Sequence, residues 1–236
     1  MDPLPPRRGR PIGFAHRGGR SGRRENTVGA FELALRQGAT GLESDTWLTA
    51  DGEVVLHHDG VIGPLWRRRA LSAQRQAQLP SYIPTLGELY DRCGTAYELS
   101  LDVRDPAAAG DILAASDACQ ATGRLWLCHD DVRVLARWRA ANGEVRLVHS
   151  TQRRRITVDM DAHAEVLRGA GVDVLNLPFR EWTPDAVAAM HARSVRVFGW
   201  GVERTGDLRA LLDAGVDGVY SDHVARMMAE VARTVV

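Results

Sequence analysis

Short apolar runs alternate with longer amphipathic segments along nearly the whole of this 236-residue chain. Short apolar runs bounded by glycine and polar residues predict buried strands, and apolar residues spaced three or four positions apart predict helices. The predicted strands cover residues 11–15, 40–42 with its continuation 53–56, 98–103, 125–128, 145–148, 172–177, 195–198 and 218–220. The predicted helices cover 27–37, 85–92, 107–121, 131–141, 162–170, 183–192 and 205–214. Eight strands that alternate with helices in a chain of this length predict an α/β fold, a (β/α)8 TIM barrel.

Polar residues follow the first two predicted strands at the points where the apolar runs end. His16 and Arg17 follow residues 11–15, Glu43 and Asp45 follow 40–42, and His58 follows 53–56. The carboxyl ends of the strands of such a barrel form one rim, where its chemistry takes place. Any one of these residues alone is better explained as a structural hydrogen-bond or salt-bridge partner. Together, two imidazoles, a guanidinium and two carboxylates at one rim suit metal-assisted attack on a phosphate ester.

Composition indicates which classes of partner and which cellular compartment to expect. Thirty basic residues balance thirty acidic ones, so bulk charge does not favour nucleic acid or a membrane surface. We interpret Arg67-Arg68-Arg69 as solvated loop charges, with a polyanion-binding role as the alternative.

The N-terminus lacks the apolar core of a signal peptide, and no apolar run approaches the roughly 20 residues of an integral membrane segment. Three widely spaced cysteines argue against a disulfide framework and predict a reducing, cytoplasmic location. The sequence leaves the oligomeric state open.

We expect residues 1–10 to form a loose N-terminal arm and residues 11–236 to form a single barrel domain. The segment 60–84 has little periodicity, so it predicts a short excursion after the second strand. Connections on that face of a barrel cover the active site.

The ordered set of polar motifs resembles that of the glycerophosphodiester phosphodiesterase family. The matching motifs are His16-Arg17-Gly18, Glu25-Asn26-Thr27, Glu43-x-Asp45, Thr49-Ala50-Asp51-Gly52, His58-Asp59 and the closing segment from Gly215 to Asp222. The resemblance extends from Ile12 to Asp222 and implies a TIM barrel.

The resemblance also implies a role for each matching residue. His16 and His58 would be the general acid and base, and imidazole titrates near neutral pH as that role requires. The cofactor would be a hard divalent cation, Mg²⁺ or Ca²⁺, held by carboxylate oxygens. Its ligands would be Glu43, Asp45 and Asp102, the phosphate would meet Arg17 and Arg104, and Trp200 would wall the alcohol pocket.

This chain departs from the family at the third strand, where the usual Glu and Lys are replaced by Asp102 and Arg104. Aspartate is one methylene shorter than glutamate, so the metal site is expected to be reshaped or bridged by water. Arginine offers a fork of donors where lysine offers a point charge. We expect His57, which faces away from His58 by strand alternation, and His149 to be structural.

Three functions remain open at this point. The first is metal-dependent hydrolysis of glycerophosphodiesters, such as glycerophosphocholine or glycerophosphoethanolamine, to sn-glycerol 3-phosphate and an alcohol, with lysophospholipids as alternative substrates. The second is a barrel hydrolase that uses transition metals. Such an enzyme would require a His-x-His pair on the first strand, where this chain has His16-Arg17-Gly18. The third is a non-catalytic binding barrel, which the substitutions at Asp102 and Arg104 would explain. The short excursion is expected to leave the pocket open, which weakens any preference for small head groups.

Overall fold

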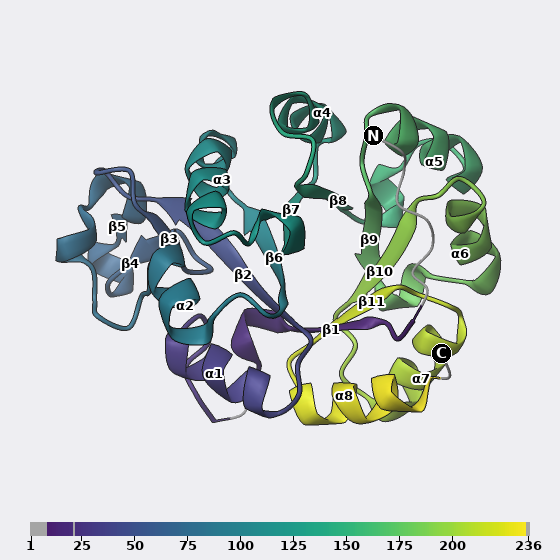
Figure 1. Cartoon of the computed structure of the whole chain (residues 1–236), viewed down its shortest axis with the longest axis horizontal. Coiled ribbons are helices and arrows are strands. Elements are labelled where there is room, and N and C mark those ends of the chain that lie inside the picture. The colour runs from purple at the N-terminus through teal and green to yellow at the C-terminus, as the bar shows by residue number, and fades with distance from the viewer. Residues whose placement is uncertain (1–8, 21, 235–236) are drawn as a thin grey trace.

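The computed structural model describes residues 9–20 and 22–234 and confirms the predicted (β/α)8 barrel (Figure 1). The sheet order is β1-β11-β10-β9-β8-β7-β6-β2-β3, and an additional pairing of β1 with β2 closes the barrel. The parallel strands of the barrel are β1 (Ile12–Ala15), β2 (Gly41–Leu48), β6 (Glu98–Val103), β7 (Leu125–His129), β8 (Arg146–Ser150), β9 (Val174–Pro178), β10 (Arg196–Trp200) and β11 (Gly218–Ser221). The remaining strand, β3 (Val54–Leu56), runs antiparallel to β2.

Helices cover the outside of this barrel (Figure 1). They are α1 (Val28–Arg36), α2 (Leu86–Cys93), α3 (Ala109–Ala118), α4 (Val132–Ala141), α5 (Met160–Gly169), α6 (Pro184–His191), α7 (Thr205–Asp213) and α8 (Val224–Arg233). Several begin at a side chain that accepts a hydrogen bond from the first turn, such as Thr27 before α1, Thr85 before α2 and Asp159 before α5. Every helix in the described part of the chain is too short or too polar to cross a membrane.

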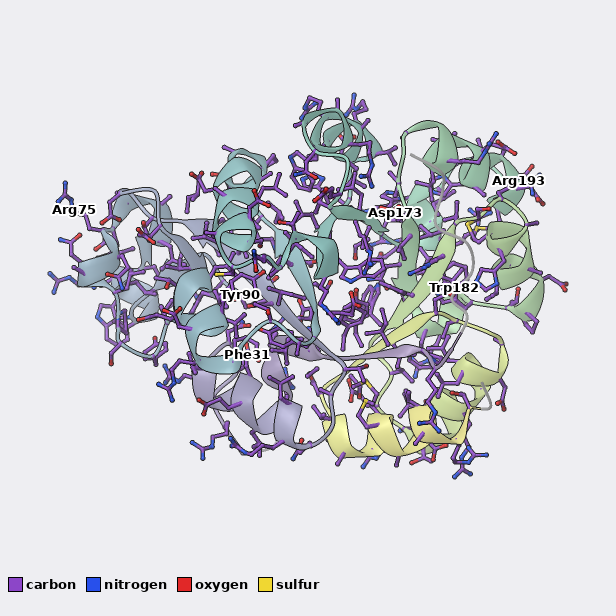
Figure 2. The ribbon with its side chains drawn as sticks, in the orientation of Figure 1. Phe31, Arg75, Tyr90, Asp173, Trp182 and Arg193 are labelled. Atoms are coloured by element: carbon purple, nitrogen blue, oxygen red, sulfur yellow. The ribbon has the colours of Figure 1, made fainter. Side chains whose placement is uncertain are left out.

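Two apolar layers fix the strands in place. Between strands and helices lies a large core, to which the labelled Phe31 and Tyr90 in Figure 2 belong. Inside the barrel a second cluster contains Phe14, Trp126, Phe198 and Tyr220 among others, and the Phe14 and Tyr220 rings stack with their centroids 4.6 Å apart. These aromatic rings fill the barrel below its carboxyl rim.

The predicted excursion is a small annex beside β2 and β3, seen at the left in Figure 1. It contains a short hairpin of β4 (Val61–Ile62) and β5 (Arg69–Ala70), with single helical turns at Leu65–Arg67, Leu71–Ala73 and Gln76–Gln78. Its own apolar core joins Ile62, Leu71 and Ile83 to Val55 of β3. Of the predicted N-terminal arm, residues 1–8 lie outside the described residues, and residues 9 and 10 are exposed.

Candidate active site

A cavity of about 690 Å³ opens at the carboxyl rim of the barrel. Most of its lining comes from the ends of the parallel strands and from the residues that follow them. The predicted site residues that line it are His16, Arg17, Glu43, Asp102, Arg104 and Trp200. Every residue of the excursion at positions 60–84 is described, and none of them lines the cavity. The excursion therefore leaves the cavity open and does not cover it.

An acidic cluster forms one wall of the site. Glu43, Asp45 and Asp102 each offer a carboxylate oxygen, and the three atoms lie within 4.8 Å of one another. Strand geometry produces this convergence, because Glu43 and Asp45 alternate along β2 and the β2–β6 register places Asp45 beside Asp102. Asp45 is 1% exposed, and its Oδ2 atom is buried without a hydrogen-bond partner among the described residues. Arg17 Nε lies 3.6 Å from this oxygen, beyond hydrogen-bond distance, so a hard cation bound among the carboxylates would give it a close partner.

The cluster is strained electrostatically. Burial, reinforced by the charges of Asp45 and Asp102, raises the pKa of Glu43 to about 8, although His16 opposes the shift. Burial and then Asp45 raise the pKa of Asp102 to about 6, even though 31% of that side chain is exposed. Burial and neighbouring carboxylates thus both disfavour the charged forms of Glu43 and Asp102.

Two arginines border the cluster. The backbone N–H of Arg17 donates to Glu43 Oε2 at 2.9 Å, and its Nη1 donates to Glu25 Oε1 at 3.1 Å. Arg17 adopts a left-handed backbone with φ at 51°, which turns its N–H toward the cluster. Arg104 donates from Nε to Asp45 Oδ1 at 2.9 Å, and its Nη2 lies 3.4 Å from Asp102 Oδ2.

His16 is held between two carboxylates. Its Nδ1 lies 2.7 Å from Asp222 Oδ1, and its Nε2 lies 3.9 Å from Glu43 Oε2. Burial lowers the pKa of His16, but Glu43 and the hydrogen bond to Asp222 outweigh burial and raise it to about 9. Asp222 is fixed in turn, because its backbone N–H is 3.2 Å from both carboxylate oxygens of Glu203.

Sequence reasoning missed Glu203. The available signal was its position, three residues after Trp200, the last residue of β10. Strand alternation predicts side-chain direction only within the strand, so it could not predict where Glu203 points in the loop. The side chain also accepts from Ser221 Oγ at 2.9 Å, so Glu203 joins the ends of β10 and β11.

The second predicted imidazole lies outside the cavity. His58 has its Nδ1 2.7 Å from Asp59 Oδ1, its side chain is 38% exposed, and it is not among the cavity residues. Its neighbour His57 donates its backbone N–H to the Asp45 carbonyl at 3.0 Å, which continues the antiparallel β2–β3 pairing. Residues directly opposite in such a pair point to the same face, so His57 lies on the side of Asp45. Burial lowers the pKa of His57, and Asp59, Asp45 and Glu25 oppose that shift. His57 does not line the cavity either, but it becomes a second candidate for the role predicted for His58.

The opposite wall includes residues of β9 and β10. Trp200 is partly buried and lines the cavity beside Asn176, whose Oδ1 is buried without a hydrogen-bond partner among the described residues. His149 does not line this cavity. It contacts the Asp130 carbonyl at 3.1 Å through Nε2 and His163 Nε2 at 3.2 Å through Nδ1, which agrees with a structural role.

Known proteins share both the sequence pattern and the fold. The sequence model of the glycerophosphoryl diester phosphodiesterase family matches residues 16–87 and 88–226. A probable glycerophosphodiester phosphodiesterase 1 from Mycobacterium tuberculosis is 49% identical over 51 residues, a match that spans 22% of this chain and 19% of that protein. A probable glycerophosphodiester phosphodiesterase 2 from the same organism is 27% identical over 92% of this chain and 89% of its own length.

Solved structures agree in fold. A putative glycerophosphoryl diester phosphodiesterase from Silicibacter pomeroyi has a TM-score of 0.85 at 22% identity, over 97% of this chain and 95% of its own. A phosphodiesterase from Oleispira antarctica, solved in complex with the product sn-glycerol-3-phosphate, has a TM-score of 0.79 at 20% identity, over 94% of this chain and 97% of its own. Because the family model matches most of the chain, this protein belongs to the glycerophosphoryl diester phosphodiesterase family of enzymes.

Proposed function

We propose that the protein is a metal-dependent phosphodiesterase that hydrolyses glycerophosphodiesters to sn-glycerol 3-phosphate and an alcohol. The observation that carries this proposal is the convergence of three carboxylates with His16 and Arg17 at one cavity. Family membership and the product bound to the Oleispira antarctica phosphodiesterase support the same reaction.

The residues that would hold the metal are Glu43, Asp45 and Asp102. Three carboxylates without a thiolate or imidazole among them favour a hard cation such as Mg²⁺ or Ca²⁺ over a transition metal. A cation bound there would neutralise charge that builds on the phosphate oxygens. The buried Asp45 Oδ2 without a hydrogen-bond partner supports this assignment.

Proton transfer is assigned to His16 and one further imidazole. With its Nδ1 directed at Asp222, His16 has Nε2 left to exchange a proton at the cavity. The family motif assigns the second role to His58, whereas the β2–β3 pairing favours His57. One imidazole would take a proton from the attacking water or hydroxyl, and the other would give one to the departing alkoxide.

Phosphate binding is assigned to Arg17 and Arg104. Arg17 lies at the cavity and would contact a phosphate oxygen. Arg104 now donates to Asp45, and a rotation of its half-exposed side chain would bring the guanidinium to a phosphate beside the cluster. Trp200 would pack against the alcohol portion of the substrate.

The open cavity supports lysophospholipids as a second substrate class. No residue of the fully described segment 60–84 lines the cavity, so that segment places no limit on the size of the alcohol. A non-catalytic barrel stays the third candidate because of Asp102 and Arg104. We also propose a cytoplasmic location, since Cys93, Cys119 and Cys128 are free thiols.

The deciding experiment is a panel assay after removal of metal by a chelator. Glycerophosphocholine, glycerophosphoethanolamine and lysophosphatidylcholine are incubated with Mg²⁺, Ca²⁺ or Mn²⁺, and both released alcohol and sn-glycerol 3-phosphate are measured. We expect no turnover in chelator and recovery with a hard divalent cation. Full activity in excess chelator would exclude the metal-dependent mechanism, and failure on every substrate would favour the binding barrel.

A paired set of variants assigns the second imidazole. His57→Ala and His58→Ala are compared on the best substrate, and the catalytic one should lose about 10²-fold or more in turnover. The other serves as the matched control, since it lies one residue away on the same loop. Near-normal turnover in both would remove the second imidazole from the mechanism.

A further inference from the structure

The tip of the β4–β5 hairpin exposes two large apolar side chains. Leu65 is 76% exposed and Trp66 is 87% exposed, the highest values among the exposed large hydrophobic residues of the described chain. A single exposed apolar residue is ordinary, whereas adjacent exposed apolar side chains form a patch of the kind found at interaction and membrane sites, and tryptophan is highly buried on average. The pair therefore needs an explanation beyond packing.

The tip is built to hold this position. β4 and β5 pair through Val61 with Ala70 and Ile62 with Arg69, and the N–H of Arg67 donates to the Pro64 carbonyl at 2.8 Å. Gly63 has φ at 97°, and a Cβ there would lie 2.7 Å from the Arg67 carbonyl oxygen, so the turn requires glycine.

The base of the hairpin is anchored. Ile62 and Leu71 are buried in the small core that they share with Val55 of β3. The exposure of Trp66 thus follows from an ordered turn on a fixed base.

The annex around this tip is strongly basic. The segment 60–84 contains four arginines, Arg67, Arg68, Arg69 and Arg75, and no aspartate or glutamate, so its formal charge is +4 in a chain whose net charge is zero. All four are exposed, and none forms an ion pair with another part of the described chain. Figure 2 shows Arg75 pointing away from the barrel, at the end of the molecule that the annex forms.

Two acidic groups at the base of the annex offset part of this charge. A hydrogen bond from Thr49 is the main cause that lowers the pKa of Asp51, and Arg75 adds to it. A hydrogen bond with His58 does the same for Asp59, with Arg68 adding to it. Neither carboxylate belongs to the hairpin, so the tip itself stays basic.

The annex lies on the cavity side of the barrel. Its core contacts Trp47, which is two residues beyond Asp45 on β2, and a Cβ on Gly60 would meet the Trp47 ring at 2.5 Å. The hairpin therefore leaves the barrel at the rim where the cavity opens.

We propose that the hairpin tip, Leu65 and Trp66 with Arg67, Arg68 and Arg69, docks the protein onto the surface of an anionic phospholipid bilayer. Tryptophan favours the membrane–water interface, where its ring is buried while its N–H stays hydrated. Arginines beside it would pair with lipid phosphates and with the negative surface potential. Docking would hold the protein at the bilayer surface through the annex, whether or not the substrate is itself a lipid.

Other occupants fit the tip less well. Two apolar side chains on a narrow tip supply little of the roughly 1,200 Å² or more that a stable protein interface buries. A nucleic acid would gain from the arginines but not from the exposed Leu65. Binding to an acidic polypeptide or to a nucleic acid is an outcome that the test below would detect.

The test is co-sedimentation of the full chain with vesicles of phosphatidylcholine alone and of phosphatidylcholine mixed with phosphatidylglycerol. We expect binding to the mixed vesicles only, and release at high salt. Trp66→Ala should weaken binding by about tenfold, since the ring no longer enters the interface. Replacing Arg67, Arg68 and Arg69 together by glutamine should weaken it on the order of 10²-fold.

Matched controls lie on α5, which exposes an aliphatic residue and an arginine of its own. Val166 is 51% exposed, so Val166→Ser and Arg168→Gln should bind vesicles like the unchanged protein. Circular dichroism and thermal unfolding of each variant separate lost docking from lost folding. Because binding needs no turnover, the outcome is independent of the proposed hydrolysis.

Three results would overturn the proposal. One is equal sedimentation of Trp66→Ala and the unchanged protein. The second is absence of binding to the mixed vesicles. The third is arginine-dependent binding to DNA or to an acidic polypeptide without any binding to vesicles.

Discussion

Arg104→Ala gives a two-sided test of how this chain arranges its metal and phosphate sites. Arg104 donates from Nε and Nη2 to Asp45 Oδ1, at 2.9 and 2.5 Å, and its Nη2 lies 3.4 Å from Asp102 Oδ2. The guanidinium thus holds two of the three carboxylates that would bind the cation. Removing it should tighten metal binding and, at the same time, deprive the phosphate of a positive partner.

The size of the expected effect follows from the distance between the Arg104 guanidinium and the carboxylates and from the exposure of its side chain. Two unit charges about 4 Å apart interact by about 4 kcal/mol near a protein surface. The Arg104 side chain is 42% exposed, so solvent screening reduces the effect to about 1–2 kcal/mol. We therefore expect metal affinity to rise about tenfold, while kcat/KM at saturating metal falls by about 10- to 100-fold.

Calorimetric titration of the metal-free protein with the cation measures metal affinity, and steady-state kinetics at saturating metal measures kcat/KM. Arg104→Lys should recover only part of both effects, because an ammonium cannot make the parallel hydrogen bonds of a guanidinium. Arg155→Gln is the matched control, since Arg155 lines the opposite wall and pairs with Asp130. If Arg104→Ala left metal affinity and both kinetic constants unchanged, the side chain would be structural and phosphate binding would rest on Arg17 and the metal.

Four further predictions concern single residues. His16→Ala should lower turnover by about 10²-fold or more while circular dichroism shows the fold retained, and near-normal turnover would refute its role. Asp222→Asn should lower turnover less and shift the pH–rate profile, because the 2.7 Å contact orients the imidazole; an unchanged profile would count against positioning. Asp45→Asn should abolish calorimetrically detectable Mg²⁺ or Ca²⁺ binding, and retained affinity would move the metal elsewhere. Burial and His149 lower the pKa of His163 from 6.5 to about 4, and the residue is only 7% exposed. The folded state therefore resists protonation and loses stability as pH falls from 6.5 through this window, by up to about 3 kcal/mol. In urea unfolding, His163→Gln should flatten that dependence, and an unchanged pH slope would assign it to other groups.

Much of the fold could be predicted because its signals are local. Apolar runs and helical spacing depend on residues a few positions apart, so the order of strands and helices was readable, and parallel strands joined by helices closed as a barrel. The ends of the strands also marked His16 and Glu43 as neighbours at one rim, and the family resemblance added Asp102. Most strand boundaries moved by one or two positions, as at β9, which begins at Val174 where we predicted residue 172. The second strand was predicted wrongly, because β2 runs on to Leu48 and residues 54–56 form a separate antiparallel strand, not its continuation. The last helix, α8, was not predicted.

Contacts between strands decided what the local pattern could not. Alternation shows that His57 and His58 face opposite ways, but only the pairing of β3 with β2 shows which of them shares a face with Asp45. Likewise, Arg104 was predicted to meet a phosphate, and the register between β2 and β6 brings it onto Asp45.

The sequence alone therefore determined the barrel, the composition of the acidic cluster and the basic character of the annex. The tertiary structure decided that Glu203 supports Asp222 and that Trp66 stands exposed at a fixed tip. The physical reason is the distance along the chain over which each signal acts. Strand and helix patterns repeat over two to four residues, whereas a side chain's partners are set by register and by the packing of segments far apart in the chain.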